Sequence, residues 1–151
     1  MQDRLAYIGI FILNIITIAS ATAAEPFIET GQWKIEIAVQ VDGKPNATPT
    51  VYMQCVNDLQ ALIQILNPQR DCLVLNTLVT GKDISWDISC VAEANTTKGS
   101  AKLIKSANNL HGKLEMRVGI PGTSFNMFTV RTIHATRISD CPSSTSSTSS
   151  K

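Results

Sequence analysis

The 151-residue chain carries 13 Lys and Arg residues against 12 Asp and Glu residues, and aromatic side chains make up 5% of it. With a charge near neutral and so few aromatic rings, it has no basic stripe to follow phosphates and no platform on which bases could stack, so nucleic acid is not an expected partner. The length suits one domain with one hydrophobic core.

The N-terminal segment predicts a secretory signal peptide over residues 1–24. A short polar head precedes an apolar run from Leu5 to Ser20, and small residues follow it. Signal peptidase recognises this order, with cleavage expected after Ala23 or Ala24. The alternative is an uncleaved membrane anchor, but the run is shorter than the roughly 20 apolar residues that a bilayer span needs, and it contains Asn14. We therefore expect export and no membrane span after cleavage.

The rest of the chain divides into a domain and a tail. Residues 25–141 contain all four cysteines, whereas residues 142–151 consist of Pro, Ser, Thr and Lys. Such a segment has no apolar side chain to bury and cannot offset the entropy of ordering. We predict a single β-rich domain over residues 25–141 and a disordered Ser/Thr tail over residues 142–151.

The first part of this domain predicts a β-hairpin followed by a helix. Apolar and polar residues alternate over 32–41, as in a strand with one buried face. Turn residues follow at 42–46, and an extended, β-branched pattern resumes over 50–55. Beyond Asn57-Asp58, which can cap a helix, apolar residues recur at helical spacing until Pro68 ends the pattern.

Five further strands are predicted after the helix, separated by short polar turns: residues 73–79, 84–91, 99–105, 110–120 and 125–138. Turns at this regular spacing, with one helix in the whole chain, favour an antiparallel meander over a crossover α/β fold. We predict a mainly β fold in which about seven strands form a curled sheet or a partly open barrel. One short helix would lie between the second and third strands.

The four cysteines lie at positions 55, 72, 90 and 141. In an exported chain an even number of cysteines predicts disulfides, here two, although four cysteines allow three connectivities that sequence does not separate. We favour Cys55 with Cys72, closing a loop around the helix, and Cys90 with Cys141, fastening the last strand to the middle of the sheet. A zinc site is the alternative, but such sites usually bring two ligands together as in C-x-x-C, and no two cysteines here are that near.

Several residues fall in a familiar order along the domain: Gly31-x-Trp33, Gln54-Cys55, Cys72, Ser85-Trp86, Cys90, Gly99, Gly112 and Arg137-Ile138-x-x-Cys141. In this order the chain resembles the exported bacterial family known as domain of unknown function 3617. It departs from the family pattern at Ser139, where a glycine is usual, and at His111, where an aromatic residue is common. The resemblance implies a β-rich fold and a periplasmic or secreted location in a Gram-negative bacterium, but no reaction and no active-site residues.

Residues able to perform chemistry are few. His111 and His134 lie on predicted strands and could converge across the sheet, where with Met53, Met116 or Met127 they could hold copper. No H-x-H, H-x-x-H or M-x-x-M spacing supports this, and methionines on alternating strands are usually core residues, so we predict no metal and no cofactor. The chain also has no G-x-S-x-G elbow and no Gly-rich phosphate motif, so we predict no catalytic residues and no enzyme activity.

Two kinds of function remain open. Trp33, Trp86 and the methionines on strands favour a binding module, in which a curved sheet holds a small apolar ligand or a peptide. Simple core packing is the more common role of such residues. The alternative is a structural or interaction protein of the cell envelope, which would act on protein partners through sheet edges or a surface patch.

Overall fold

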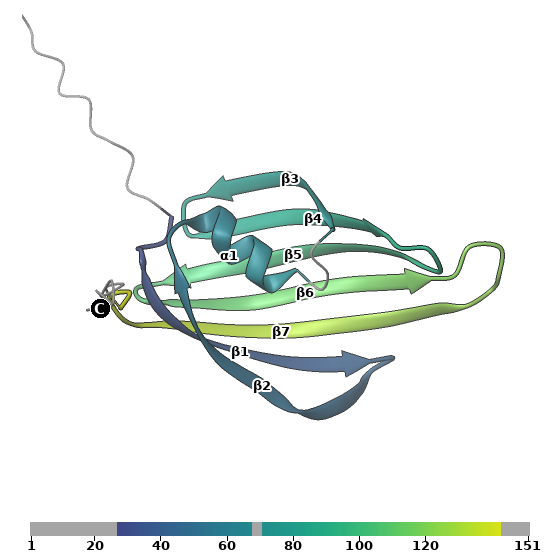
Figure 1. The fold of residues 1–151 in the computed structure, drawn as a ribbon, viewed down its shortest axis with the longest axis horizontal. Helices are drawn as coiled ribbons and strands as arrows, with labels where there is room; N and C mark the ends of the chain where they lie inside the picture. The colour runs from purple at the N-terminus through teal and green to yellow at the C-terminus, as the bar shows by residue number, and fades with distance from the viewer. Residues whose placement is uncertain (1–26, 68–70, 143–151) are drawn as a thin grey trace, which may run out of the picture.

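The computed structural model describes residues 27–67 and 71–142, so the predicted signal peptide and residues 143–151 of the predicted tail lie outside the described residues. The described chain forms seven strands and one short helix (Figure 1), which confirms the predicted mainly β fold. The elements in chain order are β1 (Gly31–Val41), β2 (Lys44–Val56), α1 (Leu59–Leu66), β3 (Leu73–Thr80), β4 (Asp83–Val91), β5 (Thr96–Ser106), β6 (Asn109–Gly119) and β7 (Asn126–Ser139).

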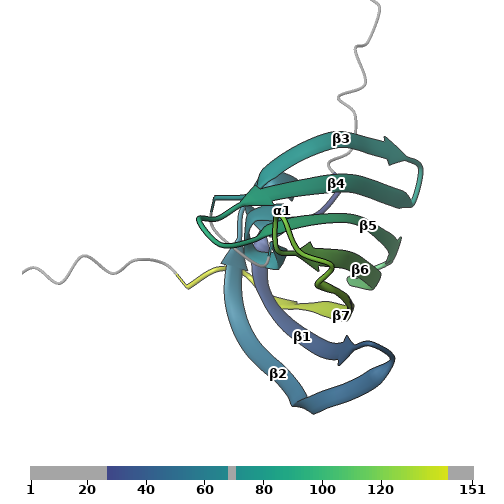
Figure 2. The same ribbon diagram turned by 90° about the vertical axis from the view of Figure 1, so that its right-hand side faces the viewer.

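All seven strands of the described chain belong to one antiparallel sheet, in the order β2-β1-β7-β6-β5-β4-β3. The meander predicted from the short turns runs from β3 to β7, and the hairpin of β1 and β2 then joins the sheet by pairing β1 with β7. The sheet is open, and β2 and β3 are its two edges. The chain passes from one edge to the other through α1, which crosses one face of the curled sheet (Figures 1 and 2).

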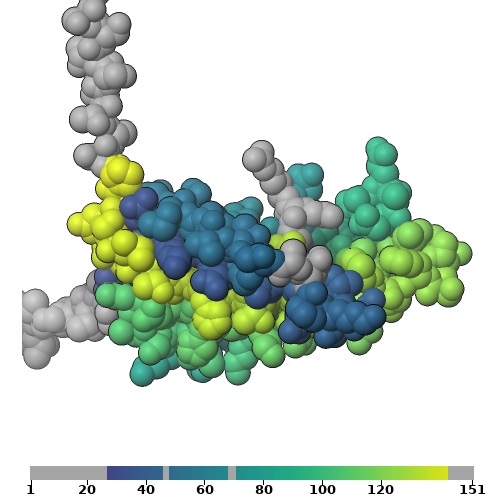
Figure 3. Space-filling model, turned by 90° about the horizontal axis from the view of Figure 1, so that it is seen from below, coloured from purple at the N-terminus to yellow at the C-terminus, as the bar shows by residue number. Residues whose placement is uncertain are grey.

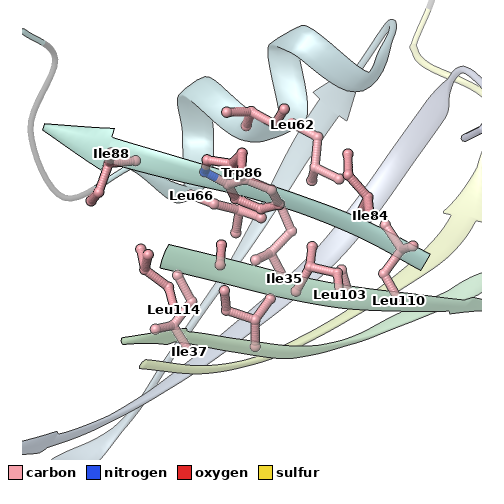
Figure 4. Close-up of a cluster of buried hydrophobic side chains, with 14 of the residues drawn as sticks. Ile35, Ile37, Leu62, Leu66, Ile84, Trp86, Ile88, Leu103, Leu110 and Leu114 are labelled. Carbon is pink, nitrogen blue, oxygen red and sulfur yellow. The ribbon is translucent and has the colours of Figure 1, made fainter. Parts of the chain in front are cut away.

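The hydrophobic core lies between α1 and the concave face of the sheet. Alternate residues of each central strand face the helix, and β4 alternates between buried and half-buried positions until its last residue. Figure 4 shows Leu62 and Leu66 of α1 directed toward side chains that come from several strands: Ile35, Ile84, Trp86, Leu103 and Leu110. The helix therefore joins the two halves of the sheet through one core.

α1 begins and ends close to where the sequence predicts. The side chain of Asp58 accepts a hydrogen bond from the backbone N–H of Ala61 at 2.7 Å, which caps the first turn. A helix of eight residues is not stable alone, so α1 depends on the burial of Leu62, Ile63 and Leu66, each worth about 1.5–3 kcal/mol. No helix of the described residues is long and apolar enough to cross a membrane.

Two glycines on the concave face allow neighbouring strands to come very close. A Cβ on Gly112 of β6 would lie 2.8 Å from the Cα of Leu103, and one on Gly99 of β5 would lie 2.8 Å from the Cγ of Met116. Real Cβ atoms do not approach other atoms that closely, so any larger residue would force the structure apart. Glycines at such positions accompany the bend of a curled sheet, which is seen end-on in Figure 2.

Two disulfides form as predicted, but the predicted pairing is wrong. Cys55 is bonded to Cys141, with Cα atoms 5.4 Å apart, and Cys72 is bonded to Cys90, with Cα atoms 4.2 Å apart. The strand order gives the reason, because Cys55 on β2 and Cys72 before β3 belong to opposite edges of the sheet. β4 is the direct neighbour of β3, and β2 and β7 flank the same strand, β1, so each cysteine finds its partner there.

Candidate functional site

The free edge of β3 is the clearest candidate for an interaction site. Val74 is its one half-buried residue, and the exposed fractions of Leu73, Leu75, Leu78 and Val79 are 66%, 45%, 61% and 45%. The strand contains no charged residue and no proline. No strand of the described chain pairs with its outer side, so its backbone N–H and C=O groups there form a template for a further strand.

β3 is held by its neighbour and a disulfide more than by core packing. The pairing with β4 is interrupted between Leu75 and Leu78, and within this bulge Asn76 donates from Nδ2 to Oδ2 of Asp87 at 2.8 Å. The Cys72–Cys90 bond ties the beginning of the strand to the end of β4. The edge thus has a fixed shape before a partner arrives, which reduces the entropy lost on binding.

β2, the opposite edge, is protected against strand pairing over its first half, residues 44–49. It begins with Lys44-Pro45 and contains Pro49, and a proline has no N–H to offer to an added strand. Its register with β1 also shifts between Ile37 and Val39, which marks a bulge. A bulge is present at both edges, whereas charge and proline, two devices by which natural sheets prevent edge-to-edge association, are present only in β2. The two edges therefore differ in their readiness to accept a strand.

Arg131 of β7 and Tyr52 of β2 form a polar pair on the concave face. Arg131 stands between Leu114 and Val39 on its neighbouring strands, and its buried Nε has no hydrogen-bond partner among the described residues. Burial lowers the pKa of Arg131, and the nearby Tyr52 opposes this shift. Burial also raises the pKa of Tyr52, and the charge of Arg131 opposes that shift. Half-buried and without a carboxylate partner in the described chain, Arg131 suits an anionic group.

The convex face carries shallow hollows. One of about 340 Å³ lies over β5 and β6, where it is lined by residues such as Lys102, His111 and Lys113. Another, of about 290 Å³, lies over β3 and β4 and includes Leu78 and Asp83. Both hollows are open to solvent, so they do not surround a small apolar ligand in the way that a typical ligand pocket does.

The two histidines converge, but the methionines do not join them. His111 of β6 stands directly opposite His134 of β7, and both side chains are exposed. Met116 is 3% exposed in the core, Met53 lies on the edge strand β2, and Met127 lies opposite Val118, seven residues from His134 along β7. Within residues 27–67 and 71–142, no group of three or more His, Cys, Asp or Glu side chains is placed to hold a metal ion.

Both tryptophans are core residues, which is the more common of the two roles considered for them. Trp33 and Trp86 are 2% and 1% exposed and belong to the core cluster. The indole N–H of Trp33 donates to the carbonyl oxygen of Glu29 at 3.2 Å, whereas that of Trp86 is buried without a partner in the described chain. Neither ring faces solvent, so neither is available as a binding surface.

Residues from both ends of the domain meet in a clasp, which we define as Gly31, Arg137 and the Cys55–Cys141 bond. Arg137 donates from Nε and Nη2 to the carbonyl oxygen of Thr30 at 3.0 and 2.9 Å. A Cβ on Gly31 would lie 2.6 Å from both Arg137 Nε and the carbonyl oxygen of Ser139, so only glycine fits. Figure 3 shows the last described residues, in yellow, against the dark blue residues at the start of the domain.

The clasp consists of residues on which the family resemblance rests. A family model described as "Protein of unknown function (DUF3617)" matches residues 28–141. The chain belongs to this family. No curated protein and no solved structure matches the chain. In this DUF3617 chain, Gly31 allows the close packing at the clasp and the four cysteines form its two disulfides, so these residues account for the architecture.

The β3 edge of this DUF3617 chain is the feature that sequence reasoning missed. A strand was predicted over 73–79, but its place at an edge depends on which strand the distant β7 pairs with. A signal was present in the sequence, since Leu73–Thr80 has no charge and no proline whereas β2 has both. That contrast is typical of an open edge beside a guarded one.

Proposed function

We propose that this protein is an exported, non-catalytic protein of the cell envelope that binds an extended segment of a partner polypeptide along β3. The observation that carries the proposal is the uncharged, proline-free and exposed edge of Leu73–Thr80. Export is supported by the N-terminal pattern, and by two disulfides of a kind that persists in oxidising compartments. The periplasm of a Gram-negative bacterium is the location that the family resemblance implies.

The chemistry of the edge specifies the kind of partner. Main-chain hydrogen bonds to β3 would supply affinity, and side chains beside Leu73, Leu75 and Leu78 would supply selectivity. Because these three side chains are apolar and exposed, the partner segment should be extended and apolar at alternate positions. The bulge between Leu75 and Leu78 divides the pairing into two short stretches, which suits a reversible complex.

Site-directed photo-crosslinking in living cells tests this proposal. A photoreactive phenylalanine analogue placed at Leu73, which is 66% exposed, should give a discrete crosslinked product with another envelope protein. The matched control is the same analogue at Thr48, an exposed residue in the protected half of β2. We expect a product from Leu73 and none from Thr48, because β3 has neither the charge nor the prolines that protect this half of β2.

A second experiment tests whether the crosslinked product depends on a partner strand that pairs with β3. Leu75→Lys together with Leu78→Lys places charges on the edge without disturbing the core, since both leucines are exposed. These substitutions should abolish the crosslink from position 73 while the far-ultraviolet circular dichroism spectrum stays unchanged. A product that survives them, equal products from both edges, or a product made only with a second copy of the chain would refute the proposed partner binding.

A second candidate function, binding of an amphipathic anion on the concave face, is favoured by Arg131. Its guanidinium has no carboxylate partner in the described chain and shares the concave face with Tyr52, whose pKa its charge lowers, so together they would hold a carboxylate. Decanoate is a suitable probe, because its charge would raise the pKa of Tyr52 further. We expect the pKa of Tyr52 in wild type to rise with decanoate concentration until it saturates, and that of Arg131→Met to stay constant. The same response in both proteins would eliminate this candidate function.

A further inference from the structure

Two histidines and a glutamate follow one another across three neighbouring strands, and the two histidines are the pair placed to share a metal ion. His111 of β6 is the direct partner of His134 of β7, and His134 is in turn the direct partner of Glu36 of β1. Directly opposed residues project to the same face of a sheet. The three residues therefore form a row on the convex face, away from the core and α1.

The hydrogen-bond pattern sets the spacing within this row. Arg137 donates its backbone N–H to the carbonyl oxygen of Asn108 at 2.9 Å, which makes Asn108 and Arg137 a hydrogen-bonded pair of the β6–β7 ladder. Pairs alternate along an antiparallel ladder, so His111 and His134 fall at a non-hydrogen-bonded position. At such positions the Cα atoms are about 4.5 Å apart and the side chains approach most closely.

The same reasoning shows that Glu36 and His134 are a hydrogen-bonded pair, in which the Cα atoms lie farther apart. Asp42 donates its N–H to the carbonyl oxygen of Phe128 at 2.8 Å, and six residues further along the β1–β7 ladder Glu36 and His134 are again a hydrogen-bonded pair. Their Cα atoms are then about 5.5 Å apart. Glu36 is thus a neighbour of the histidine pair, while the Cα atoms of the two histidines are the closer pair.

The surroundings leave the pair accessible to an ion from solvent. Both histidines are exposed, and His111 borders the open hollow over β5 and β6. Lys113 lies two residues from His111 and Lys34 two residues from Glu36, on the same face by alternation. Glu36 opposes the repulsion that these two ammonium groups exert on a cation.

We propose that His111 and His134 bind one divalent transition-metal ion on the convex face, with water in the remaining coordination positions and Glu36 as the adjacent carboxylate. Imidazole nitrogens suit copper, zinc and nickel, and for nitrogen ligands Cu²⁺ binds more tightly than Zn²⁺. The proximity comes from strand pairing, so no linear motif in the sequence reveals it. The site is independent of the β3 edge, and either can fail without the other.

Calorimetric titration of the full chain, purified without a polyhistidine tag, tests the site with Cu²⁺ and with Zn²⁺. We expect one ion per chain and tighter binding of Cu²⁺, whose electron paramagnetic resonance spectrum should show two nitrogen ligands. His111→Asn and His134→Asn should each weaken binding by about 100-fold, because the two imidazoles act as linked ligands. Glu36→Gln should weaken it by about tenfold, as expected for a neighbouring carboxylate.

Lys113→Asn is the matched control, because it changes the same face of β6 without removing a ligand. It should bind Cu²⁺ at least as tightly as wild type, since one repelling charge is gone. Because both histidines are exposed, their variants should fold normally, and thermal unfolding without metal checks this. No binding to wild type, or Cu²⁺ binding that survives in both histidine variants, would overturn the proposal.

Discussion

β2 and β3 border the same sheet at opposite sides, each with one neighbouring strand and one disulfide, yet their outward surfaces differ. Both contain a bulge, but β2 carries Lys44, Pro45 and Pro49, whereas Leu73–Thr80 has no charge and no proline. An exposed apolar edge normally invites aggregation. A fold that guards one edge and leaves the other open is what a protein that recruits a strand on one side requires.

The two edges also differ in how the chain holds them. The Cys55–Cys141 bond joins residues 86 apart in sequence and fastens β2 to the end of the domain. The Cys72–Cys90 bond joins residues 18 apart and closes the hairpin of β3 and β4. The first bond restricts almost the whole domain in the unfolded state, while the second restricts one hairpin. β2 is thus connected to a segment far away in the sequence, whereas β3 is connected to the next strand along the chain.

Removing each disulfide in turn gives the largest expected effect. Replacing Cys55 and Cys141 by alanine should lower the free energy of unfolding by about 4–5 kcal/mol, and replacing Cys72 and Cys90 by about 3 kcal/mol, because the larger loop restricts the unfolded chain more. Urea unfolding followed by tryptophan fluorescence measures both values. The reverse order would show that native-state packing around Cys72–Cys90, rather than loop length, determines the difference.

The same leucine-to-alanine change should affect stability differently in α1, which connects the two edges, and in β3, the open edge. Leu66 of α1 is fully buried, so Leu66→Ala should destabilise the fold by about 2–5 kcal/mol. Leu78 of β3 is 61% exposed, so Leu78→Ala should change stability by less than about 0.5 kcal/mol. Urea midpoints of the two variants test this. A large loss for Leu78→Ala would mean that β3 is buried in the isolated protein, contrary to a free edge.

The smallest expected effect is the pH dependence of stability that comes from Tyr52. This side chain of β2 faces the concave side of the sheet, and β3 contains no tyrosine. Because its pKa is raised in the folded state, Tyr52 contributes stability that is complete below the ordinary phenol pKa and is lost as the pH rises through the raised value. A chain cleaved after Ala23 or Ala24 keeps Tyr52 as its single tyrosine, so phenolate absorbance reports it alone.

Arg131→Met sharpens this measurement, because it removes the positive charge that lowers the pKa of Tyr52. The absorbance titration of the folded variant should therefore lie at higher pH than that of wild type, while both proteins should titrate alike in concentrated urea. A folded wild type whose Tyr52 titrates at the ordinary phenol value would contradict the burial of this side chain.

The fold followed from local patterns, while the connections between distant segments did not. Alternation over 32–41 and helical spacing after Asp58 predicted β1 and α1, because burial on one face leaves a periodic record in the sequence. Short turns predicted the meander from β3 to β7. The pairing of β1 with β7 joins residues far apart in sequence, and no local pattern records it.

That missing pairing accounts for what sequence reasoning did not find. Without it, Cys55 and Cys72 seemed natural partners because they flank a short helix, although that helix spans the sheet from edge to edge. His111 and His134 could be suspected of converging, but their direct opposition and the neighbouring Glu36 depend on the register of two ladders. Disulfide pairs and neighbouring side chains that come from different strands can be predicted only once the strand order is known.

The nested order of the two bonds, first cysteine with last and second with third, has a consequence for how the protein is made. If the chain crosses a membrane from its N-terminus, Cys55 and Cys72 reach the oxidising side first, and an oxidase acting in order of arrival would join them. That bond would tie together the two edges of the unfinished sheet and would have to be exchanged through mixed disulfides before Cys141 arrives at its partner. Native protein should therefore accumulate poorly in cells that have a thiol oxidase but no disulfide isomerase.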